Sequence, residues 1–234
     1  MTGQIGRIAT SRLAHQPRPL RLAYQGPVVN LLARELQPLR ESLQIGAELI
    51  GCDSVAAAGE IITVALTALQ ATGIGKLTLD LTMPDAVDIL ARDLSPPELE
   101  QLKARLDAKD VAGVDAKYAP LIAATGPLTS ALPKLRAYDQ DKLLASRLDQ
   151  IEAIATHINS HIAANILGEV NITLDATELH GFAYQSGVGF SIFAEQANGE
   201  IARGGSYMIN GEAAVGFSAY LDPLLEIGLG MGLG

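Results

Sequence analysis

Residues Pro17–Gly51 read PRPLRLAYQGPVVNLLARELQPLRESLQIGAELIG, and this stretch decides the fold. Leu20–Val29 mixes aliphatic and β-branched residues with a tyrosine, and Leu43–Ile50 alternates in the same manner. Both segments therefore predict β-strands. The polar residues Asn30–Glu41 between them predict a loop or a long hairpin connection.

The rest of the chain predicts strands on either side of a helical block. Asp53-Ser54 resembles a helix N-cap and Gly73 a helix stop. Helices are predicted at Val55–Ala71, Pro84–Leu94, Pro96–Ala108, Val111–Ala124, Leu128–Ala137 and Gln140–Ile166, and strands at Lys76–Leu81, Val170–Asp175, Gly187–Gln196 and Ile201–Ile209. The turn-prone Asn198-Gly199 favours a hairpin between the last two strands. This order predicts an α+β fold, a mostly antiparallel sheet with helices covering one face. The Gly-rich tail Ile227–Gly234 is predicted to be disordered.

Composition excludes several classes of protein. The hydrophobic content of 48% supports a buried core, yet the apolar stretch Ile61–Leu69 is too short and too polar to span a bilayer. The formal charge of −9 would repel a nucleic-acid backbone, so nucleic acid is not an expected partner. A single cysteine, Cys52, and the lack of a secretory signal after Met1 predict a cytoplasmic protein without disulfides.

Three blocks of sequence resemble the histidyl branch of the class II aminoacyl-tRNA synthetases. The first, Pro17–Gly51, is similar to motif 2, through Gly-Pro-Val, Arg-Glu and Gln-Ile-Gly-Ala-Glu. The second, LHGFAYQSGVGFSIFAE at Leu179–Glu195, looks like the histidine-specific segment RGLDYYTGTVFE. The third joins ARGGSY at Ala202–Tyr207, which resembles GGGRYD, to VGFSAYLDPLL at Val215–Leu225, which resembles the motif 3 helix GFSIGLERL. The resemblance implies a class II synthetase-like fold.

The departures from the family pattern concern ATP. The motif 2 arginine that binds the α-phosphate is matched by Asn30, the motif 3 arginine by Pro223, and the arginine of GGGRYD by Ser206. Arginine forks bind phosphates through charge-assisted bidentate bonds. The resemblance therefore implies a chain with no catalytic residues, which neither holds ATP nor adenylates an amino acid, and no cofactor or metal is expected.

The amino-acid side of the site is partly kept. Gln44 and Glu48 match family contacts to histidine, and since they lie four residues apart on a predicted strand, their side chains leave from one face. The resemblance implies further histidine-binding candidates: Thr2, which matches the threonine of the PE(G)T segment, Tyr184, Tyr207, His180 at the carboxylate-binding arginine, and Gln185 at the second tyrosine of DYYT.

A synthetase-like body without the ATP arginines resembles the regulatory subunit of ATP phosphoribosyltransferase. The resemblance implies a short-form catalytic subunit as partner, histidine as effector, self-association, and a role in the first step of histidine biosynthesis. It implies a first core segment over 1–82, a helical insertion over 83–167, a second core segment over 168–226 and a tail over 227–234. Thr2-Gly3-Gln4-Ile5 is expected to lie just downstream of the family's motif 1, so the chain is expected to be truncated at its N-terminus, or its start misassigned.

Other interpretations remain open at this stage. The protein could instead be an enzyme that still adenylates an amino acid, or a truncated remnant that does not assemble. Several candidates also have structural readings: Gln44 and Glu48 as solvated strand residues, Arg40-Glu41 as a loop ion pair, His157 and His161 as a solvated helix face, His180 as a bystander, Gly204-Gly205 as a close sheet contact, and Cys52 as a packing thiol.

Overall fold

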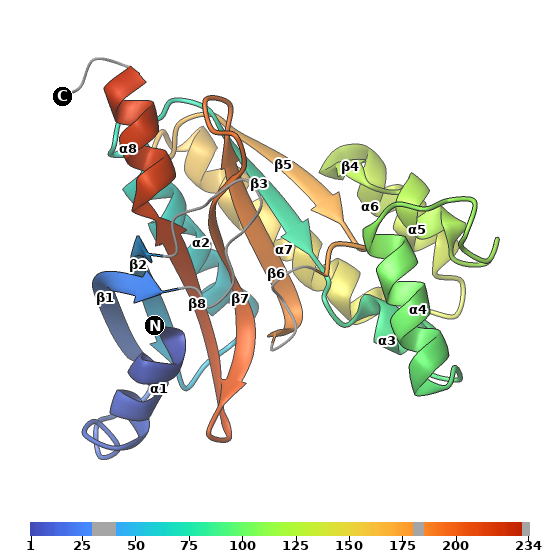
Figure 1. The fold of residues 1–234 in the computed structure, drawn as a ribbon, viewed down its shortest axis with the longest axis horizontal. Helices are drawn as coiled ribbons and strands as arrows, with labels where there is room; N and C mark the ends of the chain where they lie inside the picture. Colours follow the sequence, from blue (N-terminus) through green and yellow to red (C-terminus); the bar gives the residue numbers. More distant parts are fainter. Residues whose placement is uncertain (30–40, 180–184, 231–234) are drawn as a thin grey trace.

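The protein is organised around an eight-stranded sheet, seen here in a computed structural model that describes residues 1–29, 41–179 and 185–230 (Figure 1). The strand order is β1-β2-β8-β7-β6-β3-β5-β4. Strands β3 and β5 pair in parallel, and the other neighbouring pairs are antiparallel. The mostly antiparallel sheet predicted from the sequence is therefore confirmed.

The elements follow one another along the chain in this order. They are α1 (Thr2–Thr10), β1 (Leu20–Val29), β2 (Glu41–Ile50), α2 (Val55–Gln70), β3 (Leu77–Thr82), α3 (Ala86–Leu90), α4 (Pro96–Asp107), α5 (Ala119–Ala123), β4 (Gly126–Pro127), α6 (Leu128–Tyr138), α7 (Ala145–Ala163), β5 (Val170–Asp175), β6 (Gln185–Ala194), β7 (Glu200–Ile209), β8 (Glu212–Tyr220) and α8 (Leu221–Gly230).

The two longest helices, α2 and α7, pack against each other and cover one face of the sheet (Figure 1). Ser54 caps α2 as predicted, because its side chain accepts a hydrogen bond from the backbone N–H of Ala57. The helices bury apolar side chains such as Leu66 and Ile154 against strand residues that include Leu49 and Leu79. Within the part of the chain that the structure describes, no helix is both long and apolar enough to span a bilayer.

The opposite face of the sheet, which we call the site face, carries the alternate residues of the same strands. In β2, Glu48 alternates with Ala47 and Leu49, and the latter two belong to or pack on the main core. Helix α1 covers one end of the site face, where Ala9 packs with Ile50 in a small second cluster. Next to this cluster, polar strand residues and glycines line the hollows that are described below.

Several sequence predictions need correction. Residues 111–118 are turns rather than helix, because the side chains of Asp110 and Asp115 accept hydrogen bonds from the backbone N–H groups of Gly113 and Lys117. The stretch that resembles a motif 3 helix is divided between β8 and α8, so its first half is a strand. Helix α1 was not predicted, and α8 runs through Gly230 where disorder was predicted from residue 227. The predicted connection over residues 30–40 lies outside the described residues.

Candidate functional site

A buried carboxylate is the centre of the site. Glu48 of β2 is only 2% exposed. The hydroxyl of Tyr207 on β7 donates to its Oε2 at 2.7 Å, and the hydroxyl of Thr2 at the start of α1 donates to its Oε1 at 2.9 Å. Three residues that the sequence predicted from segments far apart are therefore joined by two hydrogen bonds.

A glycine allows Glu48 to reach Tyr207. Strand β8 lies between β2 and β7, and in the register Glu48 stands opposite Gly216, which stands opposite Gly205 of β7. A β-carbon at position 216 would collide with Oε2 of Glu48. The carboxylate therefore lies over the bare backbone of Gly216, and only glycine leaves room for it.

Burial and hydrogen bonding act on Glu48 in opposite directions. Burial raises the pKa of the Glu48 carboxyl, and the hydrogen bonds from Tyr207 and Thr2 oppose that rise without cancelling it. Tyr24 of β1 adds to this polar group, because its hydroxyl lies 2.8 Å from the Oγ of Ser218. Burial and the nearby Glu48 raise the pKa of Tyr24 to about 12, so it stays protonated and can serve as a donor.

An open hollow of about 500 Å³, the inner hollow, borders this carboxylate. Gln44, Tyr207 and Arg203 are among its lining residues. It shares Thr2, Arg203, Tyr207 and Ser218 with a small recess that Glu48, Gly205 and Gly216 also line. The inner hollow and its recess together offer a buried acceptor, an amide and hydroxyl donors, a set that suits the donor groups of a small amino acid.

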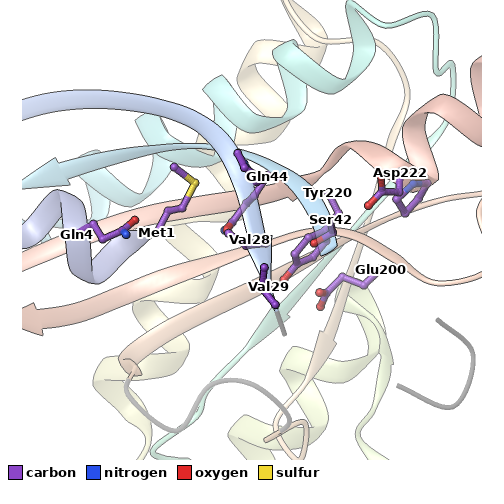
Figure 2. Close-up of a pocket in the computed structure, with 11 residues that line it drawn as sticks. Met1, Gln4, Val28, Val29, Ser42, Gln44, Glu200, Tyr220 and Asp222 are labelled. Atoms are coloured by element: carbon purple, nitrogen blue, oxygen red, sulfur yellow. The ribbon is translucent and has the colours of Figure 1, made fainter. Parts of the chain in front are cut away.

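A second hollow of about 470 Å³, the outer hollow, lies where β1, β2, β8, the start of β7 and the start of α8 come together (Figure 2). Gln44 and Tyr220 line both hollows. Glu200 and Asp222 contribute carboxylates to the outer one, and none of its described lining residues is Lys or Arg. Its described lining is therefore suited to a cation or a neutral group rather than to a polyphosphate.

The other predicted binding residues are placed as follows. Gln44 is 8% exposed and Glu48 2%, so their interpretation as solvated strand residues is wrong. Gln185 pairs with Tyr207 across β6 and β7. His180 and Tyr184 lie outside the described residues.

Of the three positions that resemble lost ATP arginines, the structure describes two. Pro223 lines the outer hollow. Ser206 is adjacent to Tyr207 in β7, so its side chain leaves from the opposite face. Asn30, like Arg40 of the predicted loop ion pair, lies outside the described residues.

The two histidines of α7 have a packing role. Their ring centroids are 4.3 Å apart, and His157 is half-buried beside Gly59 of α2, with its Nε2 3.3 Å from the Oγ1 of Thr63. A purely solvated helix face was therefore wrong for His157. Among residues 1–29, 41–179 and 185–230, no three His, Cys, Asp or Glu side chains are grouped so that they could hold a metal ion. The close sheet contact predicted at Gly204 is confirmed, since a side chain there would meet the ring of Phe190.

Sequence reasoning missed two residues of the site. Tyr24 was taken only as a strand former, although alternation places it on the same face as Leu22 and Gly26. Arg203 was overlooked because it stands where the resembling motif has glycine. Arg203 is the one charged residue within the predicted strand Ile201–Ile209, and this is the signal that could have found it.

Known proteins share this fold. The ATP phosphoribosyltransferase regulatory subunit/histidyl-tRNA synthetase from Bacillus halodurans C superimposes with a TM-score of 0.81 at 24% identity, over 95% of this chain and 62% of that one. A chain of the ATP phosphoribosyl transferase (HisG:HisZ) complex from Thermotoga maritima gives 0.71 at 18% identity, over 93% of this chain and 79% of that one. At these identities the two structures support the fold, and the predicted class II synthetase-like fold is confirmed.

Sequence comparison gives closer relatives. The ATP phosphoribosyltransferase regulatory subunit of Rhodospirillum centenum is 37% identical over 97% of this chain, and that of Paramagnetospirillum magneticum 36% identical over 96%. The chain spans 60% and 61% of the length of these two relatives. The family model for histidyl-tRNA synthetase matches residues 1–224. The chain therefore belongs to the histidyl-tRNA synthetase family, and its regulatory-subunit relatives confirm the resemblance found in the sequence.

Proposed function

We propose that this protein is a non-catalytic regulatory subunit of ATP phosphoribosyltransferase, which binds histidine in the inner hollow. It would be required for the activity of a short catalytic subunit and would let histidine inhibit the first step of histidine biosynthesis. The observation that carries the proposal is the set of Glu48, Tyr207 and Thr2, joined by two hydrogen bonds beside Gln44. The names of the curated relatives supply the partner.

Histidine fits the chemistry of this set. Its α-ammonium and its imidazole N–H are donors, and Glu48 is a buried acceptor whose two oxygens together offer about four lone-pair positions. The hydroxyls of Thr2 and Tyr207 occupy two of these positions and fix the carboxylate in place. A preorganised acceptor loses little conformational entropy when a ligand donor reaches it.

The outer hollow supports the non-catalytic part of the proposal. In the resembling synthetases, arginines bind the triphosphate of ATP, whereas here Glu200 and Asp222 are the charged side chains among the described lining residues. Glu200 is neutralised by its ion pair with Arg203, whereas Asp222 repels phosphate oxygens, and no Lys or Arg among the described lining residues offsets the charge that develops during adenylation. The alternative of an amino-acid-activating enzyme therefore receives no support from these residues.

Co-expression with the short catalytic subunit from the same genome tests the proposal. We expect a stable complex on size exclusion, phosphoribosyl transfer raised over the catalytic subunit alone, and inhibition of that activity by histidine. The variant Glu48→Ala should keep the complex and the activation, because Glu48 is buried and does not form part of the surface that a partner would contact. The same variant should lose the inhibition by histidine. The absence of a complex would refute the regulatory role, and full inhibition of the Glu48→Ala complex would refute the histidine site.

A further inference from the structure

Two separate elements supply the hydroxyls that hold the Glu48 carboxylate. Thr2 is the first residue of α1, whereas Tyr207 lies on β7, which forms a hairpin with β8. The apolar contact between α1 and the sheet is small, because Gly6 and Ala9 are the buried residues of this helix. The position of Thr2 beside Glu48 therefore depends on further contacts that hold α1 against the hairpin.

The side chain of Arg18 makes such contacts at the other end of α1. Its Nε donates to Oε2 of Glu212 at 2.6 Å and its Nη2 to Oε1 at 2.9 Å, and Glu212 is the first residue of β8. Nη2 also donates to the backbone carbonyl of Ala9 at 3.3 Å, and Nη1 donates at 3.0 Å to the carbonyls of Leu13 and Gln16. Arg18 therefore joins the end of α1, and the turns that follow it, to the β7–β8 hairpin.

Close packing keeps the Arg18 side chain in this position. Gly51 directly follows β2 with a φ of +95°, and a β-carbon there would lie 2.8 Å from the β-carbon of Arg18. The Arg18 and Glu212 side chains are 22% and 31% exposed, and the planar guanidinium matches the carboxylate in a bidentate pair. The same hairpin supplies another bond to the helix, since Nδ2 of Asn210 donates to Oγ1 of Thr10 at 2.9 Å. The end of α1 is therefore fixed at several points.

Arg18 is not among the described residues that line the inner hollow or its recess, so its effect on a ligand is indirect. Helix α1 has nine residues and is about 13 Å long, with Arg18 bound at one end and Thr2 at the other. We propose that Arg18 is a positioning residue for the histidine site, which holds α1 against the β7–β8 hairpin so that Thr2 and Tyr207 meet the same carboxylate. This inference rests on the proposed function and extends it to a residue outside the hollow. A carboxylate that is fixed before the ligand arrives loses less conformational entropy on binding, so histidine affinity should depend on Arg18.

Calorimetry with L-histidine on single and double variants tests the inference. Thr2→Val removes the hydroxyl that donates to Glu48 and should weaken histidine binding about tenfold, the lower range for a hydrogen bond to a charged group. Arg18→Gln should weaken binding about fivefold in the wild-type background. In the Thr2→Val background it should weaken binding less than about twofold, because no hydroxyl remains for α1 to position. An equal loss in both backgrounds would overturn the inference, since Arg18 would then act on the fold in general.

Two further variants separate positioning from a general loss of charge or of folding. Arg21→Gln is the matched control, since Arg21 also forms a bidentate ion pair, with Glu60 of α2, and should leave the affinity unchanged. If Arg18→Gln fails to fold, Glu212→Gln removes the carboxylate charge but keeps one acceptor, and should give a loss of about threefold that again disappears in the Thr2→Val background. Wild-type affinity in the folded variant would refute this inference alone, whereas a wild type that does not bind histidine would refute it together with the histidine site.

Discussion

Replacing Asp80 with asparagine should stabilise the protein at neutral pH. Asp80 lies on β3, and burial raises the pKa of its carboxyl from 3.8 to about 6, although the hydroxyl of Thr173 on β5 donates to it. Because the folded pKa is raised, the folded state binds more protons than the unfolded state between these values. The free energy of unfolding therefore falls as the pH rises from about 4 to about 6, and the loss is complete at pH 7.

The magnitude follows from the shift. Two pKa units correspond to about 3 kcal/mol at 1.36 kcal/mol per unit, and the partial exposure of Asp80 reduces this to about 2 kcal/mol. Asparagine keeps an acceptor for Thr173 but carries no charge. Asp80→Asn should therefore gain about 2 kcal/mol at pH 7.5 and less than about 1 kcal/mol at pH 4.

Urea unfolding followed by circular dichroism, at both pH values, measures these differences. Asp175→Asn on the neighbouring strand is the control with the opposite sign. Burial acts to raise the pKa of Asp175, but hydrogen bonds from Lys109, whose Nζ lies 2.6 Å away, and from Thr177 lower it overall. That variant should lose stability at pH 7.5. A neutral or destabilising Asp80→Asn at pH 7.5, or an equal gain at both pH values, would show that burial does not penalise the Asp80 charge.

The remaining predictions concern the two hollows. Glu48→Ala should weaken histidine by more than about 1.5 kcal/mol in calorimetry, since a hydrogen bond to a charged group is lost, and equal binding would reject the pocket assignment. Gly216→Ala should cost about 1–3 kcal/mol of stability and abolish histidine binding, because the added methyl group displaces the Glu48 carboxylate. The control Gly75→Ala should have neither effect, since an added β-carbon there would have no atom within 4 Å. ATP–pyrophosphate exchange should stay at background with any amino acid, since Asp222 repels the triphosphate and no described lining residue of the outer hollow is Lys or Arg. Exchange above background would favour the enzyme alternative.

Periodic segments were predictable from the sequence, and β1 and β5 were predicted to the residue because their apolar and β-branched residues have a clear strand pattern. Strand β8 was missed because small residues such as Ala213 and Ala214 carry little strand signal, and its end was assigned to a helix. Helix was predicted over residues 111–118 because composition favours it there, whereas aspartate side chains fix turns by local hydrogen bonds.

The site was only partly predictable for a physical reason. The spacing of Gln44 and Glu48 predicted that both side chains leave the strand on the same face, and both residues are buried in the structure. Thr2 and Tyr207 came from the family resemblance, because contacts between segments so distant in sequence have no periodic signal. Arg203 depends on the register of β7 against β8, which composition does not determine.

The Glu48 carboxylate has space because the facing strand residue, Gly216, has no side chain. Mutations that enlarge and mutations that reduce the residue at this position therefore have unequal effects. Gly216 already presents the smallest possible residue, so no substitution there can enlarge the space, and one added carbon fills it. A change of ligand size must therefore arise at the rim, for example at the exposed Met208, where side chains can be shortened as well as lengthened. Efforts to redesign specificity should vary the rim and leave the strand glycines untouched.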